Sequence, residues 1–465
     1  MKIRNLIIAF LLLAGFVCPA TAAPKYIFYF IGDGMGHGAV MLAQLYKSRV
    51  LGDSLPLSML SMPVVTMATT YSASSPVTDS AAAGTALATG HKTKNGMLGM
   101  TADTVAVNSV AKVLHDNGFG VGLVTTVAPD DATPGAFYAH QPNRSMYFEI
   151  GKQAASSGYD FIAGANLRGG KNNPARRDEL QQAFEENDVR IVRGVDGLNR
   201  LDAKKILLLN ADTASWNEIG YSVDSLPGVL TLPAMTQACL DHLTANRPDR
   251  FFMMVEGGSI DHAGHANDPA ASVQETLTFD KCIGIALDFY RKHPDETLIV
   301  VTADHETGGL ALGNKELHYD MNPGVLKYSR MSIGRFSDEC KAMLKSRRIY
   351  TWDDMRDILR DNFGLFGPVD VSEKDEAALR TQFEQTFELR NSADRKTLYD
   401  SFNAFADSVF ALISRLSGAG WTTGFHTGSP VPVFAIGAGS EAFSGMNDNT
   451  MIPVKILNAA GYSFS

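Results

Sequence analysis

Short apolar runs alternate along this chain with longer segments in which apolar residues recur at helical spacing. The runs occupy residues 25–31, 121–126, 205–209, 250–255, 297–301 and 431–436. Because strands inside a parallel sheet are buried on both faces, continuous runs of this length predict such strands. The intervening segments predict helices at 38–50, 80–89, 105–117, 232–245 and 268–292. This alternation predicts an α/β fold with a doubly wound, mostly parallel central sheet flanked by helices.

The segment between His305 and His426 has a different pattern. Thr351 resembles a helix cap, and apolar residues follow it at one-face spacing from Trp352 to Phe363. Further helical patterns follow, at 372–387 and 402–416. The residues that bound the segment, His305 and His426, are both candidates for a functional site. We therefore expect a largely helical, crown-like insertion at about 313–420 inside one domain that spans 24–465.

Two other segments lack a clear pattern. Residues 51–76 are rich in Ser, Pro and Met and are interpreted as irregular. Residues 160–200 are interpreted as a second, polar insertion.

Residues 1–23 are typical of a secretory signal peptide. Lys2 and Arg4 form a charged start, residues 6–17 form an apolar core, and Ala20-Thr21-Ala22 fits a cleavage site. The core is too short for a transmembrane helix, and no later run is long and apolar enough for one. The sequence therefore predicts an exported protein, periplasmic or extracellular, without a membrane span.

Composition narrows the functional class. The chain has 465 residues, 45% of them hydrophobic, with 42 glycines and a net charge of −9. A chain this acidic is not expected to bind nucleic acid, which requires a basic face. An anionic substrate would need a local positive site, such as metal ions or an arginine. After the leader only Cys239, Cys282 and Cys340 remain, so no disulfide framework is expected.

Acids and histidines gather at the ends of the predicted strands. Ligands bind beyond the carboxyl ends of strands in a doubly wound sheet, so these residues are expected to meet. They are Asp33, Asp131, Thr133, Glu256, Asp261, His262, His265, Asp304 and His305, and His426 just before the last strand.

The ligand types suggest two kinds of metal site. The Asp and His residues form a mixed set of the kind that Zn²⁺ takes, whereas Asp33, Thr133 and Glu256 offer only oxygen, which suits Mg²⁺. Taken singly, each residue has a structural alternative: Asp-His pairs occur in turns, and a threonine before a proline often caps a helix. The arginine at 144 is either an anion clamp or an ordinary surface residue.

Ser80 opens a helix of very small residues and follows Asp79. A serine there is either a nucleophile at a helix start, where anions are favoured, or an ordinary N-cap.

These stretches together resemble the alkaline phosphatases. The resemblance runs from about residue 25 to 440 and preserves motif order and local spacing. The matching motifs are Ile31-Gly32-Asp33-Gly34-Met35-Gly36, Val77-Thr78-Asp79-Ser80-Ala81-Ala82, Asp131-Ala132-Thr133-Pro134, Val255-Glu256-Gly257-Gly258-Ser259-Ile260-Asp261, Thr302-Ala303-Asp304-His305-Glu306 and His426-Thr427-Gly428.

The resemblance implies a role for each residue. Ser80 would be the nucleophile that becomes phosphoserine, Arg144 would bind the phosphate, and Asp79 would orient Arg144. Metal ligands would fall into three sets: Asp261, His265 and His426 for a first zinc; Asp33, Asp304 and His305 for a second; and Asp33, Thr133 and Glu256 for one magnesium, with Asp131 nearby through water.

The implied reaction is hydrolysis of phosphate monoesters, with broad specificity and inorganic phosphate as a product. The family is usually dimeric, so the resemblance also points to a homodimer. One departure is His262, which stands where the best-studied bacterial members carry lysine, while Asp131 keeps the bacterial type. The alternatives are a phosphodiesterase or sulfatase of the same superfamily, or a phosphate- or metal-binding protein without turnover.

Overall fold

The computed structural model describes residues 23–212 and 215–464. Apart from Ala23, the expected signal peptide lies outside this range. Within it, no helix has both the length and the apolar character needed to cross a membrane.

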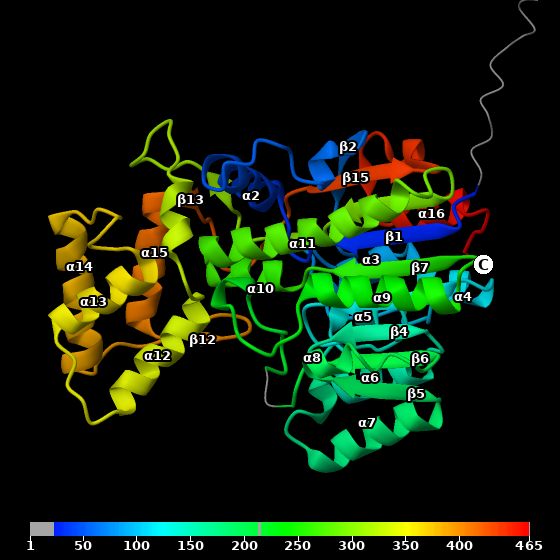
Figure 1. Cartoon of the computed structure of the whole chain (residues 1–465), viewed down its shortest axis with the longest axis horizontal. Helices are drawn as coiled ribbons and strands as arrows, with labels where there is room; N and C mark the ends of the chain where they lie inside the picture. The colour runs from blue at the N-terminus through cyan, green and yellow to red at the C-terminus, as the bar shows by residue number, and fades with distance from the viewer. Residues whose placement is uncertain (1–22, 213–214, 465) are drawn as a thin grey trace, which may run out of the picture.

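A sheet of ten strands runs through the middle of the molecule (Figure 1). In spatial order the strands are β16 (Asn447–Asp448), β2 (Val64–Thr69), β15 (Val431–Gly437), β8 (Thr297–Thr302), β1 (Tyr26–Ile31), β7 (Phe251–Glu256), β3 (Gly120–Thr125), β4 (Phe161–Gly164), β6 (Lys205–Leu209) and β5 (Val189–Arg193). The pairs from β8 to β5 are parallel, and the strands at the centre are buried along almost their whole length. The predicted fold class is therefore confirmed.

One strand of this sheet, β15, runs against the others. It pairs antiparallel with β8 on one side and with β2 on the other, whereas β2 and β16 are parallel. The start of β15 therefore lies at the edge where the parallel strands end. This reversal brings the residues before β15 to the same edge as the residues after β1, β7 and β8.

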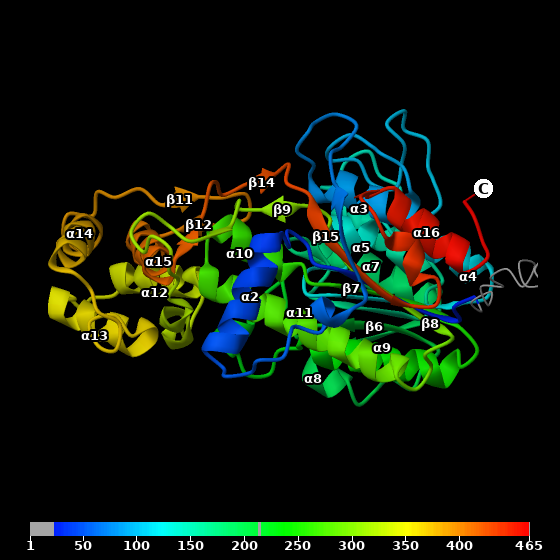
Figure 2. The same cartoon turned by 90° about the horizontal axis from the view of Figure 1, so that it is seen from above.

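Helices cover both faces of the sheet (Figure 2). On one face lie α2 (His37–Arg49), α9 (Leu232–Asn246) and α11 (Pro269–Tyr290), and on the other α3 (Ser80–Thr89), α4 (Val110–Asp116) and α16 (Met451–Ala459). The shorter or more peripheral helices are α5 (Ala132–Gly135), α6 (Tyr147–Ser156), α7 (Pro174–Glu186), α8 (Gly194–Gly197) and α10 (Ser259–Ala266). Asp268 caps α11, because its side chain accepts hydrogen bonds from the backbone N–H groups of Ala270 and Ala271.

Three expectations about local structure were wrong. The segment 51–76 contains β2, and the segment 160–200 contains the sheet strands β4 and β5. The strands β2 and β5 lack continuous apolar runs, since part of each remains in solvent: Val65 of β2 is 59% exposed, and Arg190 of β5 is also exposed. By contrast, β4 is fully buried but only four residues long. The helix expected at 105–117 begins only at Val110, because Ser109 caps it there.

Four helices between the site-bearing segments lie together beyond the carboxyl ends of the parallel strands (Figure 1). They are α12 (Ile333–Lys345), α13 (Trp352–Phe363), α14 (Glu373–Phe383) and α15 (Ala404–Ser417). The base of this segment is joined by the antiparallel pairing of β10 (Ala311–Leu312) with β13 (Ala419–Gly420). The insertion thus leaves and re-enters the sheet domain at one place.

Candidate active site

The register of the central strands brings three acidic segments to one level. Ile31, the last residue of β1, pairs with Glu256 at the end of β7 and with Thr302 at the end of β8. Asp33 and Asp304 follow within two residues of those strand ends, and the side chains of Asp33, Glu256 and Asp304 are buried. The strand ends therefore concentrate carboxylates in a small volume away from water.

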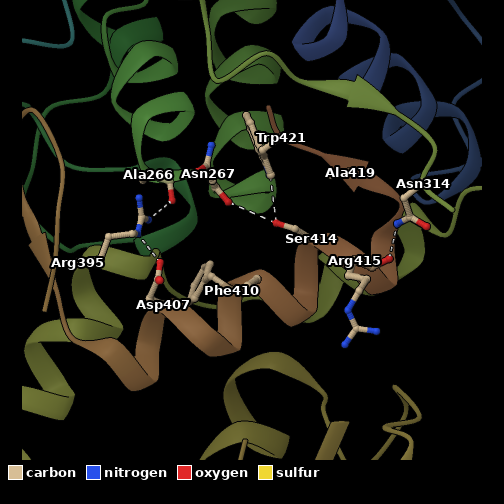
Figure 3. A pocket seen from close by; sticks show the side chains of 11 residues that line it. Ala266, Asn267, Asn314, Arg395, Asp407, Phe410, Ser414, Arg415, Ala419 and Trp421 are labelled. Carbon is tan, nitrogen blue, oxygen red and sulfur yellow. Dashed lines mark hydrogen bonds and ion pairs between the residues drawn. The ribbon is translucent and has the colours of Figure 1, made fainter. Parts of the chain in front are cut away.

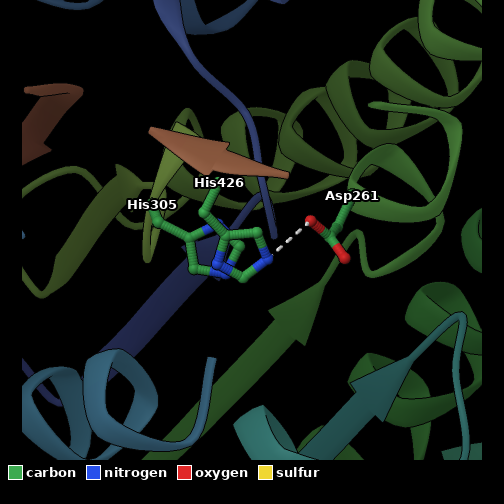
Figure 4. A group of neighbouring side chains, drawn as sticks. All are labelled: Asp261, His305 and His426. Atoms are coloured by element: carbon green, nitrogen blue, oxygen red, sulfur yellow. Dashed lines mark ion pairs between the residues drawn. The ribbon is translucent and has the colours of Figure 1, made fainter. Parts of the chain in front are cut away.

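His426 reaches this volume from the reversed strand. It belongs to β14 (His426–Thr427), which pairs antiparallel with β9 (Glu306–Thr307) next to His305. The rings of His305 and His426 are stacked, with centroids 3.6 Å apart, as Figure 4 shows beside Asp261. The antiparallel β15 thus explains how a residue that precedes a strand meets residues that follow strands.

Two overlapping groups of side chains could each hold a metal ion. The ligand atoms of Asp33, Asp304 and His305 lie within 4.8 Å of one another, and so do those of Asp261, His305 and His426. His305 belongs to both groups, which differs from the division that the resemblance implies.

His265 nevertheless lies beside the second of these groups. Its Nε2 atom is 3.1 Å from Nε2 of His426 and 3.3 Å from Oδ2 of Asp261. All six Asp and His residues of the two predicted zinc sites therefore converge.

Unpaired oxygen atoms support cation binding in this cluster. In this cluster, five buried side-chain oxygens form no hydrogen bond to a described residue: Asp33 Oδ1, Thr133 Oγ1, Glu256 Oε1, Asp261 Oδ2 and Asp304 Oδ2. Three of them, on Asp33, Asp261 and Asp304, lie 3.2 to 3.3 Å from an imidazole nitrogen of His265 or His305. Buried polar atoms are rarely left unsatisfied, so a group of them in one place indicates a missing partner. The donor set of carboxylates, imidazoles and one hydroxyl fits zinc and magnesium.

The electrostatics of the carboxylates also favour a cation. Burial, followed by the charge of Asp304, raises the pKa of Asp33 well above its usual value. Burial and the charge of Asp261 raise the pKa of Asp304 in the same way. Burial raises the pKa of Glu256 to about 7. A divalent cation would offset both the burial penalty and the repulsion between these groups.

Ser80 lies beside His305, which belongs to both groups of possible metal ligands. It is the first residue of α3 and is 1% exposed, and its Oγ atom lies 3.1 Å from Nε2 of His305. The cap of α3 is Asp79, whose Oδ1 accepts a hydrogen bond from the backbone N–H of Ala82. The capping explanation for Ser80 is therefore wrong, since the neighbouring aspartate does that work.

Arg144 is held by two carboxylates and is not a free surface residue. Its Nη1 donates to Oδ2 of Asp79, and its Nη2 donates to Oδ1 of Asp131, each at 3.3 Å. Asp79 therefore both caps α3 and pairs with the guanidinium of Arg144.

His262, the residue that departs from the bacterial pattern, has a carboxylate partner in the structure. Asp131 and His262 have different partners: Nη1 of Arg168 donates to Oδ2 of Asp131 at 2.7 Å, and Nδ1 of His262 lies 2.6 Å from Oε2 of Glu218. Burial opposes the charged form of His262, but the hydrogen bond and charge of Glu218 outweigh it and raise its pKa to about 9. Burial likewise opposes ionisation of Asp131, yet Arg168 and Arg144 lower its pKa to about 2.

Arg168, Glu218 and Tyr399 are site neighbours that the sequence did not indicate. Arg168 lies near β4, Glu218 lies in an irregular loop, and Tyr399 comes from the insertion. None lies in a recognisable motif, and only the polar character of residues 160–200 hinted at Arg168.

Comparisons with known sequences point to one family. A family profile described as alkaline phosphatase matches residues 24–462. The chain is 30% identical over 455 residues to alkaline phosphatase 3 of Bacillus subtilis, which covers 94% of this chain and 89% of that protein. It is 27% identical over 459 residues to the repressible alkaline phosphatase of Saccharomyces cerevisiae, with 90% and 76% covered.

Solved structures agree with the sequence relatives. The fold is similar to that of the cold-active alkaline phosphatase from Shewanella sp., with a TM-score of 0.78, 28% identity and coverage of 93% of this chain and 99% of that one. It is similar to Thermus thermophilus alkaline phosphatase, with a TM-score of 0.77, 27% identity and coverage of 97% and 96%. The match spans the sheet, the acidic strand ends and the serine-bearing helix, and the chain belongs to the alkaline phosphatase family of phosphomonoester hydrolases.

Proposed function

We propose that the chain hydrolyses phosphate monoesters through a phosphoserine intermediate on Ser80, with two zinc ions and one magnesium ion bound. The observation that carries this proposal is the position of Ser80. Its Oγ atom lies beside His305, at the start of a helix and next to a cluster of unpaired carboxylate oxygens. Arg144 donates a hydrogen bond to Asp79, the residue before Ser80.

The residues would divide between three ions as the resemblance implies. Asp261, His265 and His426 would hold one zinc, and Asp33, Asp304 and His305 the other. Asp33, Thr133 and Glu256 would hold the magnesium. Bound zinc supplies Lewis-acid chemistry, which lowers the pKa of a nearby hydroxyl or water and stabilises negative charge on oxygen.

The chain's own residues position the phosphoryl group. Arg144 would bind two phosphoryl oxygens through its planar guanidinium, and the N-terminus of α3 favours the same negative charge. Ser80 Oγ would form a bond to phosphorus as it loses its proton, while the bond to the leaving-group oxygen breaks and that oxygen takes up a proton to depart as the alcohol. Water would then cleave the phosphoserine, returning the Ser80 hydroxyl and releasing inorganic phosphate.

Specificity and location follow from other features. These contacts hold the phosphoryl group, so broad specificity for the leaving group is expected. The signal-peptide pattern at 1–23 supports export to the periplasm or the medium. The family's usual assembly supports a homodimer.

The reaction class can be tested with three chromogenic esters. Purified protein should hydrolyse p-nitrophenyl phosphate at least about 100-fold faster, by kcat/KM, than bis-p-nitrophenyl phosphate or p-nitrophenyl sulfate, because Arg144 and the helix start fit a terminal phosphoryl group. Faster hydrolysis of the diester or the sulfate would favour the phosphodiesterase or sulfatase alternative. Tight phosphate binding without turnover of any ester would indicate a binding protein.

Replacement of Arg144 by alanine tests the phosphate contact. The Arg144→Ala variant should lose about 100-fold in kcat/KM, because a charge-assisted, bidentate contact to the phosphoryl group is removed. Steady-state kinetics with p-nitrophenyl phosphate measure this loss. Arg347→Ala is the matched control, because Arg347 is exposed and lies in the loop between α12 and α13. Equal rates for the two variants would show that Arg144 does not contact the substrate.

A further inference from the structure

A small hairpin extends from the insertion to the active-site helix α10. Its strands are β11 (Arg395–Lys396) and β12 (Ser401–Phe402), which pair antiparallel. Two hydrogen bonds between Thr397 and Asp400 close the connecting turn. Thr397 N donates to the carbonyl of Asp400 at 2.8 Å, and Asp400 N donates to Thr397 Oγ1 at 3.0 Å. Tyr399 lies in this turn.

The base of the hairpin is attached to the sheet domain and to the insertion. Nη2 of Arg395 donates to the carbonyl of Ala266, the last residue of α10, at 2.8 Å. The same guanidinium forms an ion pair with Asp407 of α15. Figure 3 shows Arg395 between these two partners, at the edge of a pocket of about 370 Å³. On the other strand, the residue after β12, Asn403, donates its backbone N–H to Ser337 Oγ at 2.8 Å.

These contacts fix where the turn lies. The Tyr399 ring packs on two imidazoles of α10: its centroid is 4.3 Å from that of His262, with 42° between the ring planes, and 5.2 Å from that of His265, nearly edge-on. His262 is therefore held from two directions, by the Tyr399 ring and by the Glu218 carboxylate at Nδ1. Its Nε2 atom forms no hydrogen bond to another described residue.

We propose that Tyr399 is a positioning residue of the active site, through which the insertion holds the His262 imidazole with Nε2 free for the phosphoryl group. This proposal rests on the proposed function, because it assigns the free nitrogen to the same substrate. It makes the insertion part of the site: a shift of the hairpin would change the orientation of His262.

We assign this role to the aromatic ring of Tyr399 and not to its hydroxyl. The phenol oxygen forms no hydrogen bond to another described residue, whereas the ring contacts both imidazoles. An aromatic face against an imidazole gives both packing and an electrostatic attraction. Phenylalanine should therefore replace tyrosine, and alanine should not.

Calorimetric binding of inorganic phosphate to the metal-loaded full chain tests this role. Tyr399→Ala should raise the phosphate Kd about tenfold and raise KM for p-nitrophenyl phosphate more than it lowers kcat, because His262 loses its fixed orientation. Tyr399→Phe should restore most of the lost affinity. Leu398→Ala is the matched control, since Leu398 is in the same turn and is 55% exposed.

A double-mutant cycle shows whether Tyr399 acts through His262. The variant that combines Tyr399→Ala with His262→Ala should have the same phosphate Kd as His262→Ala alone. A residue that acts only by positioning another has no effect once that other residue is removed. Additive effects, an unchanged Kd in Tyr399→Ala, or a Phe variant as weak as the Ala variant would overturn the proposal. Should Tyr399→Ala fail to fold, Tyr399→Leu replaces it with the same expectation.

The proposed function can fail separately from this inference. Absence of monoester hydrolysis by the native chain would reject the function. Normal hydrolysis with additive variants would reject only the role of Tyr399.

Discussion

Replacement of Ser80 by alanine is expected to lower kcat for p-nitrophenyl phosphate by a factor on the order of 1,000 or more, because it removes the oxygen that we propose carries the phosphoryl group. This loss of kcat should come from the missing hydroxyl and not from a change in the fold. Ser80 is the first residue of α3, but the cap of that helix is Asp79, and alanine is a good helix former. The thermal unfolding temperature of Ser80→Ala should therefore stay close to that of the native chain.

Acid quenching with ³²P-labelled substrate gives an independent measurement of the intermediate. Label should be found on the tryptic peptide that contains Ser80 in the native chain, and should be absent in Ser80→Ala. The exposed serine at 156 serves as a control, and Ser156→Ala should keep both the rate and the label. A Ser80→Ala variant that turns over at the native rate would reject the phosphoserine pathway.

Removal of bound metal is expected to lower activity by more than about 100-fold, because the buried carboxylates would lose the charge that balances them and the Lewis acidity of the proposed zinc ions would be lost. The protein should also unfold at a lower temperature. An ion that binds only the folded state stabilises it, by about 2.7 kcal/mol when free ion is at 100 times its Kd. Dialysis against a chelator removes the metal, and elemental analysis measures what remains. An assay with p-nitrophenyl phosphate then measures activity, and calorimetric melting measures the unfolding temperature. Added zinc with magnesium should restore activity, and calcium should not.

A single ligand substitution makes the metal prediction specific. Asp304→Asn keeps the shape of the side chain but removes one charge from the cluster, so zinc content and activity should fall together. Asp295→Asn is the matched control, because Asp295 is exposed and outside the cluster. Full activity in protein shown by elemental analysis to be free of metal, or fewer than two zinc ions per active chain, would contradict the proposed metal assignment.

The central strands and the motifs at their ends could be predicted from the sequence. Residues 25–31, 250–255 and 297–301 are apolar without interruption because both faces of those strands are buried, and that pattern is local. Ligands at the carboxyl ends of parallel strands meet by topology, so Asp33, Glu256 and Asp304 could be grouped without coordinates.

Strands that leave some of their side chains in solvent could not be predicted from the sequence in the same way. The outer strand β5 carries arginines at 190 and 193, and β2 leaves Val65 and Met67 in solvent. Their residues follow no pattern that distinguishes a strand from a loop. These strands form because a neighbouring strand offers backbone hydrogen bonds, which is a property of the tertiary structure and not of the segment.

The direction of β15 and the partners of His262 also depended on the fold alone. Sequence places His426 before a strand, which in an all-parallel sheet would be the wrong edge; the antiparallel pairing of β15 with β8 brings it to His305. Likewise, Glu218 and Tyr399 lie 44 and 137 residues from His262, in segments without motifs. Local patterns determine burial and candidate chemistry, whereas contacts between distant segments follow from strand direction and packing, which no single segment encodes.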